Sequence, residues 1–227
     1  MKELAVPAIK IASGDLRSTP LLRYAAKTEI PLIISTGGAN LIEVKNALSL
    51  VNPKKVGLLQ CTAAYPAEAK LMNLNVISTF RNTFPETVIG LSSHDVGISF
   101  PVMAAVLGAR IIEKHFTIDR SLKGTDHSFS LEPIGMGKMC RDLKNVPIAL
   151  GSYEKNSHES ETLGIRKMGK MVVYSSNLHV GTKLSDENLE IRSPLEGVSA
   201  SHWDSIVGKT LKKNVRALDP VAYDDFS

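Results

Sequence analysis

The chain has 227 residues, of which 43% are hydrophobic and 22% charged, and its formal net charge is +4 at pH 7. This is the balance of an ordinary globular protein, and the scattered basic residues do not form the tract expected of a nucleic-acid-binding surface. No apolar run is long enough to cross a membrane, and the first ten residues lack the apolar core of a signal peptide. The two cysteines, Cys61 and Cys140, lie far apart without a CxxC spacing, which favours reduced thiols and a cytoplasmic location.

From the start of the chain to about residue 150, short β-rich runs alternate with segments of helical periodicity. The strands are predicted at residues 8–13, 31–36, 56–62, 88–94 and 111–116. The helices between them are predicted at residues 19–27, 39–51, 74–84 and 100–108. A repeated strand–helix order is typical of a parallel sheet with right-handed crossovers, so we assign the chain to the α/β class. Because all five strands end in polar residues, we expect part of a TIM-type barrel rather than a doubly wound sheet.

Only five strand–helix units can be recognised, whereas a complete (β/α)8 barrel has eight units in roughly 250 residues. The sheet is therefore either open or lacks its first three units. The chain starts almost directly with the first predicted strand, without a lead-in segment, which favours an N-terminal truncation. We expect residues 1–150 to form a partial barrel made of the last five units.

The strand–helix alternation stops near Leu150. Residues 151–165 are polar and charged, which is typical of a linker. Residues 166–227 contain short strand candidates, turn signals and one short predicted helix at 201–207, which Gly208 would end. We expect a compact, mostly β second domain of about sixty residues, a size that can fold on its own.

Two histidines, His94 and His115, lie at the ends of successive predicted strands. Strand alternation puts Ser92 on the same face as His94, and Glu113 on the same face as His115. If the apolar residues opposite them pack on the helices, all four side chains converge inside the barrel. Neutral imidazoles on adjacent strand ends are good ligands for Zn, Mn or Fe, although two hydrogen-bonded interior histidines would show the same pattern. No third ligand is evident from the spacing, so water and substrate oxygens would have to complete the shell of a catalytic metal.

Lys10 lies between two isoleucines in a strand that we expect to be buried on both faces. An unpaired buried ammonium costs several kcal/mol, so it needs an anion beside it. That anion is either an interior carboxylate such as Glu113 or a bound phosphate or carboxylate group. Ser13, Ser35 and Thr36, at neighbouring strand ends, could donate to the same bound anion, although serines in such places also cap helices.

Residues 119–133 follow the last predicted strand and have too little helical pattern for an element. Gly124, Asp126 and His127 lie together in this segment, which is long enough to fold over the strand ends. Loops in such places often carry function, although a solvated turn is the alternative interpretation.

Six segments occur along the first part of the chain in this order: IKIASGD, STGG, LLQCTAAYP, GLSSHDVG, IEKHFTID and KGTDHSFSLEP. In sequence and spacing they resemble the sialic acid synthase family, whose members join phosphoenolpyruvate to an N-acetylated hexosamine. RKMGKMVVYSSNLHVGTKLSDENLEIRSPLEG and VGKTLKKNV resemble that family's C-terminal antifreeze-like (SAF) domain. The resemblance implies a TIM-type barrel that begins here at the family's fourth strand. The family's glutamate base and a further lysine at the phosphate therefore have no counterpart.

The resemblance also implies roles for individual residues. His94 and His115 match the family's ligands for a divalent metal, manganese above all, with Mg²⁺ or Co²⁺ as alternatives. Lys10 matches a group at phosphoenolpyruvate, and we expect Lys10 and His115 to be catalytic. The further substrate contacts correspond to Ser13, Ser35, Tyr65 and Ser92 around phosphoenolpyruvate and to Asp126 at the sugar.

The chain departs from the family pattern at two substrate contacts. Many bacterial members have an asparagine two residues before the tyrosine, where this chain has Ala63. The family arginine that reaches from the antifreeze-like domain into a neighbouring subunit's site aligns with Ser193, and the adjacent Arg192 is the candidate to replace it. The family arrangement implies a homodimer in which the antifreeze-like domain covers the partner's barrel.

The implied reaction starts with a metal that polarises the aldehyde of the open-chain sugar. The phosphoenolpyruvate methylene attacks the aldehyde carbon, water adds at the former enol carbon, and phosphate leaves by C–O cleavage. Lys10 would hold anionic charge throughout by preorganised electrostatics. N-acetylmannosamine, its 6-phosphate and bacterial dideoxy sugars all remain open as the acceptor.

Two interpretations without catalysis also remain open. The chain is either an inactive fragment or shortened isoform, or a carbohydrate-binding module built on the antifreeze-like domain with a vestigial barrel. Five strands would leave two parallel edges unpaired, which favours the first of these. The motif residues kept in the barrel argue against the second.

Overall fold

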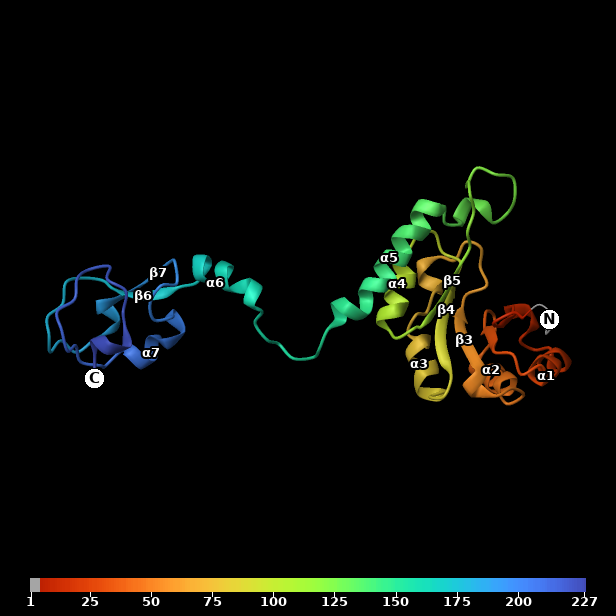
Figure 1. The fold of residues 1–227 in the computed structure, drawn as a ribbon, viewed down its shortest axis with the longest axis horizontal. Coiled ribbons are helices and arrows are strands. Elements are labelled where there is room, and N and C mark those ends of the chain that lie inside the picture. The colour runs from red at the N-terminus through yellow and green to blue at the C-terminus, as the bar shows by residue number, and fades with distance from the viewer. Residues whose placement is uncertain (1–4) are drawn as a thin grey trace. The chain divides into compact units, whose positions relative to one another are not determined.

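The computed structural model describes residues 5–227, and the chain forms two compact units whose boundary in the sequence lies between Ser152 and Tyr153. The first unit contains a five-stranded parallel sheet whose strands follow one another in chain order. The strands are β1 (Ile9–Ile11), β2 (Leu32–Ser35), β3 (Val56–Cys61), β4 (Val88–Ser93) and β5 (Ile111–Lys114). Figure 1 shows β3, β4 and β5 side by side. The predicted α/β class and the five-stranded part of a barrel are confirmed.

Helices connect successive strands, as right-handed parallel crossovers require. They are α1 (Thr19–Lys27), α2 (Leu41–Leu48), α3 (Val76–Thr83) and α4 (Ser99–Val106), and α5 (Pro133–Leu150) follows the last strand. Local chemistry fixes the start of α2, where Asn40 accepts from two helix amides and Glu43 accepts from the Asn40 amide, forming a capping box. Arg17 pairs with the same Glu43 carboxylate and so ties the loop after β1 to this helix.

Helix α5 was not among the predicted elements. Its sequence contains Gly135, Gly137 and Pro147, three residues that weaken helical periodicity as a signal. The helix starts with a proline at its first position, where proline is favoured, and it packs against α4. Tertiary packing therefore stabilises a helix that local propensity alone does not indicate.

Strand alternation separates the two faces of the sheet. On one face, Ile11, Ile34, Leu58 and Leu91 join apolar residues of α1 to α4 in a single core. The opposite face has polar side chains near its carboxyl edge. The expectation that Lys10 lies in a strand buried on both faces is wrong, because this face is accessible at β1 and the Lys10 side chain keeps 35% of its exposure.

After α5, residues 151–158 have no regular structure, and α6 (Thr162–Met168) begins inside the segment expected to be a linker. The second unit contains β6 (Met171–Tyr174), antiparallel to β7 (Leu189–Arg192). The helix predicted at 201–207 corresponds to α7 (Trp203–Ile206), and Gly208 follows it with a φ of 88°, a conformation that favours glycine. The core of this unit is formed by residues such as Val172, Tyr174, Leu184, Ile206 and Leu211. No helix among residues 5–227 is both long and apolar enough to cross a membrane.

Candidate active site at the carboxyl edge of the sheet

A chain of polar contacts crosses the open face of the sheet from β1 to β5. The Lys10 ammonium donates to Ser35 Oγ at 2.8 Å and lies 3.4 Å from a carboxylate oxygen of Glu113. Ser92 Oγ donates to the other Glu113 oxygen at 2.7 Å. The predicted convergence of Ser92 with Glu113 is therefore confirmed, and so is the carboxylate partner of Lys10. Because Lys10 and Glu113 remain partly exposed, a soluble anion can still approach the ammonium.

His94 and His115 lie beyond the ends of β4 and β5, with their ring centroids 5.2 Å apart. His94 Nδ1 lies 2.8 Å from the Thr62 carbonyl oxygen, which can only accept, so Nδ1 carries the proton and Nε2 keeps a free lone pair. Burial lowers the pKa of His94, which is 6% exposed, and the charges of His115 and Lys114 act in the same direction. The lowered pKa favours the neutral ring over the protonated one, although the hydrogen bond to Thr62 acts in the opposite direction. In the neutral ring, that hydrogen bond selects the tautomer whose Nε2 can bind a metal.

The donor chemistry of this pair fits a divalent metal that is held weakly. Two imidazoles in contact provide two nitrogen ligands, and the described residues contain no group of three or more histidine, cysteine or acidic side chains arranged to hold an ion. An ion here would therefore keep open positions for water or substrate, as catalytic sites do. Asp126, whose Oδ2 lies 3.6 Å from His115 Nδ1, can orient that ring.

Aromatic rings and one loop enclose the histidines. The Tyr65 ring lies 4.2 Å from that of His94 and 5.9 Å from that of His115. Burial raises the pKa of Tyr65, and the negative charges of Cys61, Asp126 and Glu113 add to this. The loop after β5 brings Asp126 and Phe129 against His115, whereas His127 turns to the Thr117 hydroxyl, 2.7 Å away.

The hydroxyls of Ser13 and Thr36 have different surroundings from those expected. Ser13 Oγ accepts from the Gly37 amide at 2.9 Å and lies 3.4 Å from Cys61 Sγ. These contacts keep it near the carboxyl end of β1, the strand that contains Lys10. Thr36 is buried and donates to the Leu59 carbonyl oxygen at 2.8 Å. Thr36 was expected to be able to donate to the same anion as Ser35, but its hydroxyl proton is already used by the Leu59 carbonyl oxygen on the buried side of the sheet.

Arg192 lies at the end of β7 in the second unit, where it forms an ion pair with Glu190. Sequence reasoning also missed a buried ion pair between Lys114 and Asp95 directly behind the histidines. Alternation had put Lys114 on the helix side of its strand, and a buried lysine there requires a carboxylate, so the signal was present.

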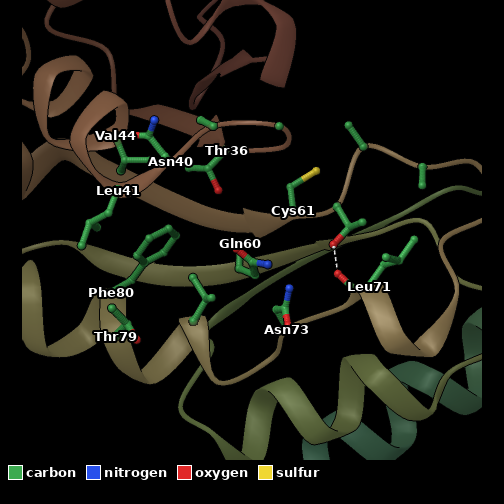
Figure 2. A pocket seen from close by; sticks show the side chains of 16 residues that line it. Thr36, Asn40, Leu41, Val44, Gln60, Cys61, Leu71, Asn73, Thr79 and Phe80 are labelled. Atoms are coloured by element: carbon green, nitrogen blue, oxygen red, sulfur yellow. Dashed lines mark hydrogen bonds between the residues drawn. The ribbon is translucent and has the colours of Figure 1, made fainter.

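A separate cavity of about 420 Å³ lies on the helix side of β3, between α2 and α3 (Figure 2). Amide side chains and hydroxyls line it together with an apolar floor, and neither Lys10, Glu113 nor His115 is among the lining residues. Thr62 joins the two regions, since its side chain donates to the Leu71 carbonyl oxygen in the cavity wall and its own carbonyl accepts from His94. The labelled lining residues are Thr36, Asn40, Leu41, Val44, Gln60, Cys61, Leu71, Asn73, Thr79 and Phe80.

Comparison with known proteins relates this arrangement to one family. Residues 1–155 match the model of the NeuB family, and residues 169–227 match the SAF domain. The N-acetylneuraminate-9-phosphate synthase of Homo sapiens is 36% identical over 224 residues, which is 97% of this chain and 62% of the human protein. The N,N'-diacetyllegionaminic acid synthase of Campylobacter jejuni is 34% identical over 95% of this chain and 66% of its own length. The chain thus spans just under two thirds of these relatives.

The crystal structure of N-acetylneuraminic acid (sialic acid) synthetase from Leptospira borgpetersenii, in complex with citrate, has a similar fold. It superposes with a TM-score of 0.65 at 36% sequence identity, covering 72% of this chain and 58% of that protein. Its fold and the family match agree with the half-barrel sheet described above. The chain belongs to the NeuB family and has a C-terminal SAF domain.

Proposed function

We propose that this chain takes part in the metal-dependent condensation of phosphoenolpyruvate with an N-acetylated hexosamine, which yields a nonulosonic acid and phosphate. The acceptor is N-acetylmannosamine, its 6-phosphate or a related sugar, since relatives are named synthases of different acids of this kind. One observation carries the proposal. A lysine and two serines suited to an anion lie at the same sheet edge as two neighbouring imidazoles.

In this proposal, the residues near Lys10 and those near the histidines bind different ligands. Lys10, with Ser13, Ser35 and Ser92 near it, binds the phosphate and carboxylate of phosphoenolpyruvate and keeps their charge compensated during the reaction. Tyr65 covers the histidines, and Asp126 holds the sugar through its exposed carboxylate. A divalent ion held by His94 and His115, Mn²⁺ with Mg²⁺ or Co²⁺ as alternatives, would supply Lewis-acid polarisation of the sugar carbonyl.

The reaction then needs no covalent enzyme intermediate. The phosphoenolpyruvate methylene carbon forms a bond to the sugar carbonyl carbon, water adds to the former enol carbon, and the C–O bond to phosphate breaks. Lys10 acts by fixed charge and not as a nucleophile, because its ammonium already donates to Ser35 and faces Glu113. Because both substrates are held at one edge, the two carbons that form the bond are positioned by the protein and do not have to meet by diffusion.

The proposal extends to the assembly and location of the protein. We propose a homodimer in which the SAF domain of one subunit covers the barrel of its partner, with Arg192 as the residue that reaches the partner's site. Both cysteines are free, Cys61 buried and Cys140 exposed, which supports a reducing compartment and hence the cytoplasm.

The test is phosphate release by the purified full chain mixed with Mn²⁺, phosphoenolpyruvate and N-acetylmannosamine. We expect release that requires both the ion and the sugar. We also expect His94→Ala and His115→Ala to lose Mn²⁺ binding in titrations, whereas His179→Ala, an exposed histidine of the second unit, retains it. A folded protein that binds sugar but releases no phosphate would support the carbohydrate-binding alternative. Unchanged Mn²⁺ binding in both histidine variants would overturn the metal site.

A further inference from the structure

A buried ion pair lies directly behind the two histidines. Lys114 precedes His115 at the end of β5, and Asp95 follows His94 just beyond β4. The two side chains keep 1% and 2% of their exposure, and the Lys114 ammonium contacts both the carboxylate and the backbone carbonyl oxygen of Asp95. Ser93, which is also buried, donates to the same carboxylate. By strand alternation this pair occupies the helix-facing side, opposite the imidazoles.

The pair lies where the regular pairing of β4 with β5 ends. The last residues in register are Ser93 and Lys114, one position before each histidine. Beyond them, the carbonyl oxygens of His94 and His115 accept from the loop amides of Ala67 and Leu131. The regular backbone pairing of β4 with β5 therefore stops before the histidines. There the Lys114 ammonium links the two strand ends through its contacts with Asp95.

Stability alone does not explain a buried ion pair in this place. Desolvating two charges costs about as much as their attraction returns, and apolar replacements of similar volume are often neutral or stabilising. The pair does fix the geometry of the two strand ends. The Lys114 side chain, at the end of β5, donates to the backbone carbonyl oxygen of Asp95, just beyond β4.

We propose that Lys114 and Asp95 are positioning residues that hold the strand ends at the spacing required for His94 and His115 to share one ion. The role of the ion rests on the function proposed above, whereas the spacing of the two rings does not. Removing the pair should let the strand ends separate and should weaken metal binding while the unit stays folded. Loss of groups that orient metal ligands typically costs 10- to 100-fold in metal affinity.

The test compares three full-length proteins by Mn²⁺ titration followed by electron paramagnetic resonance. They are the unaltered chain, the charge-free double variant Asp95→Asn/Lys114→Met, and a control, Lys54→Met/Glu86→Gln. The control removes an ion pair of 3.1 Å from the same unit, but it is exposed and lies before β3 and β4, at the opposite edge of the sheet. We expect Mn²⁺ affinity to fall about 10- to 100-fold in the first variant and to be unchanged in the control, with similar melting temperatures for both.

Affinity within twofold of the unaltered chain in a folded Asp95→Asn/Lys114→Met protein would overturn the proposal. If this variant does not fold, Ser93→Ala serves instead, because it keeps both charges and removes only one hydrogen bond to Asp95. We expect Ser93→Ala to bind Mn²⁺ several-fold more weakly, and unaltered affinity there would also overturn the proposal.

A second measurement separates this proposal from the proposed function. The ring protons of His94 and His115 should give a nuclear Overhauser effect in metal-free protein, since the rings are in edge contact. We expect this signal to disappear in the double variant and to persist in the control. If the unaltered chain binds no Mn²⁺, the proposed metal site is wrong, and the ring signal alone then tests whether Lys114 and Asp95 position the histidines. A ring signal that persists in the double variant overturns that positioning role.

Discussion

Lys10 is the side chain on which the proposed anion-binding part of the site depends. Its ammonium donates to the Ile11 carbonyl oxygen at 3.1 Å and to Ser35 at 2.8 Å, and it faces Glu113. These contacts hold the charge at the carboxyl edge of β1 before any ligand arrives. Under the proposed function, an incoming phosphate would meet a preorganised cation and compete with one partly exposed carboxylate.

Replacing Lys10 by methionine should remove this cation with little change in volume. We expect Lys10→Met to weaken phosphoenolpyruvate binding about 10- to 100-fold, because hydrogen bonds to charged groups contribute about 1.5–3 kcal/mol. Isothermal titration calorimetry measures the affinity, with Lys27→Met as the control because Lys27 is exposed at the end of α1. Equal affinities for the two variants would show that the anion binds elsewhere.

At the scale of elements, the close approach of β4 to β5 determines where the histidines can meet. Gly90 pairs with Ile111 in the ladder. A Cβ added at Gly90 would lie 2.3 Å from the Ile111 carbonyl oxygen and 2.5 Å from a methyl group of Leu59. Only glycine fits there, because a backbone oxygen cannot move away as a flexible side chain can.

Two glycine-to-alanine substitutions should therefore have opposite effects on the free energy of unfolding. Gly90→Ala should destabilise the first unit by about 1–3 kcal/mol through overpacking. Gly137→Ala, at an exposed position in the second turn of α5 with no atom within 4 Å of the added Cβ, should stabilise it by about 0.5–1 kcal/mol. Urea unfolding followed by circular dichroism measures both. A neutral Gly90→Ala variant would contradict the tight approach of the strands.

At the scale of the whole molecule, each unit has its own core and its own buried charge. In the second unit, buried Asp225 accepts from the Tyr174 hydroxyl and the Ala222 amide, both at 2.9 Å, and pairs with Lys213 at 2.6 Å. Burial by itself would raise the pKa of Asp225, but the contacts with Lys213, Ala222 and Tyr174 outweigh it, so the pKa lies below its ordinary value. A carboxylate with a lowered pKa stabilises the folded state above its unfolded pKa of about 4, and this contribution is lost as the pH falls through the folded pKa.

Asp225→Asn should therefore destabilise the second unit by about 2 kcal/mol at pH 7 and by progressively less as the pH falls below about 4. The only tryptophan, Trp203, lies in this unit, so its fluorescence during urea unfolding reports on the second unit. Asp224→Asn is the matched control, because Asp224 is the exposed neighbour. A difference between the two variants that does not shrink in acid would contradict the lowered pKa.

Sequence by itself determined the features that depend on local periodicity. The five-stranded parallel sheet follows from the repeated strand–helix order. The face of Ser92 and that of Glu113 follow from alternation with a period of two. The family motifs also indicated the division into barrel units and a SAF domain. These features were predictable because each is encoded within a few consecutive residues.

Only the tertiary structure decided which groups meet across the sheet. It paired Lys114 with Asp95, placed Tyr65 over His94, turned Thr36 away from Lys10 and stabilised α5 through α4. Each of these depends on contacts between residues far apart in the chain, which helical or strand periodicity does not specify. The two histidines were predictable as neighbours, whereas the ion pair behind them and the distance between their rings are properties of the packed sheet alone.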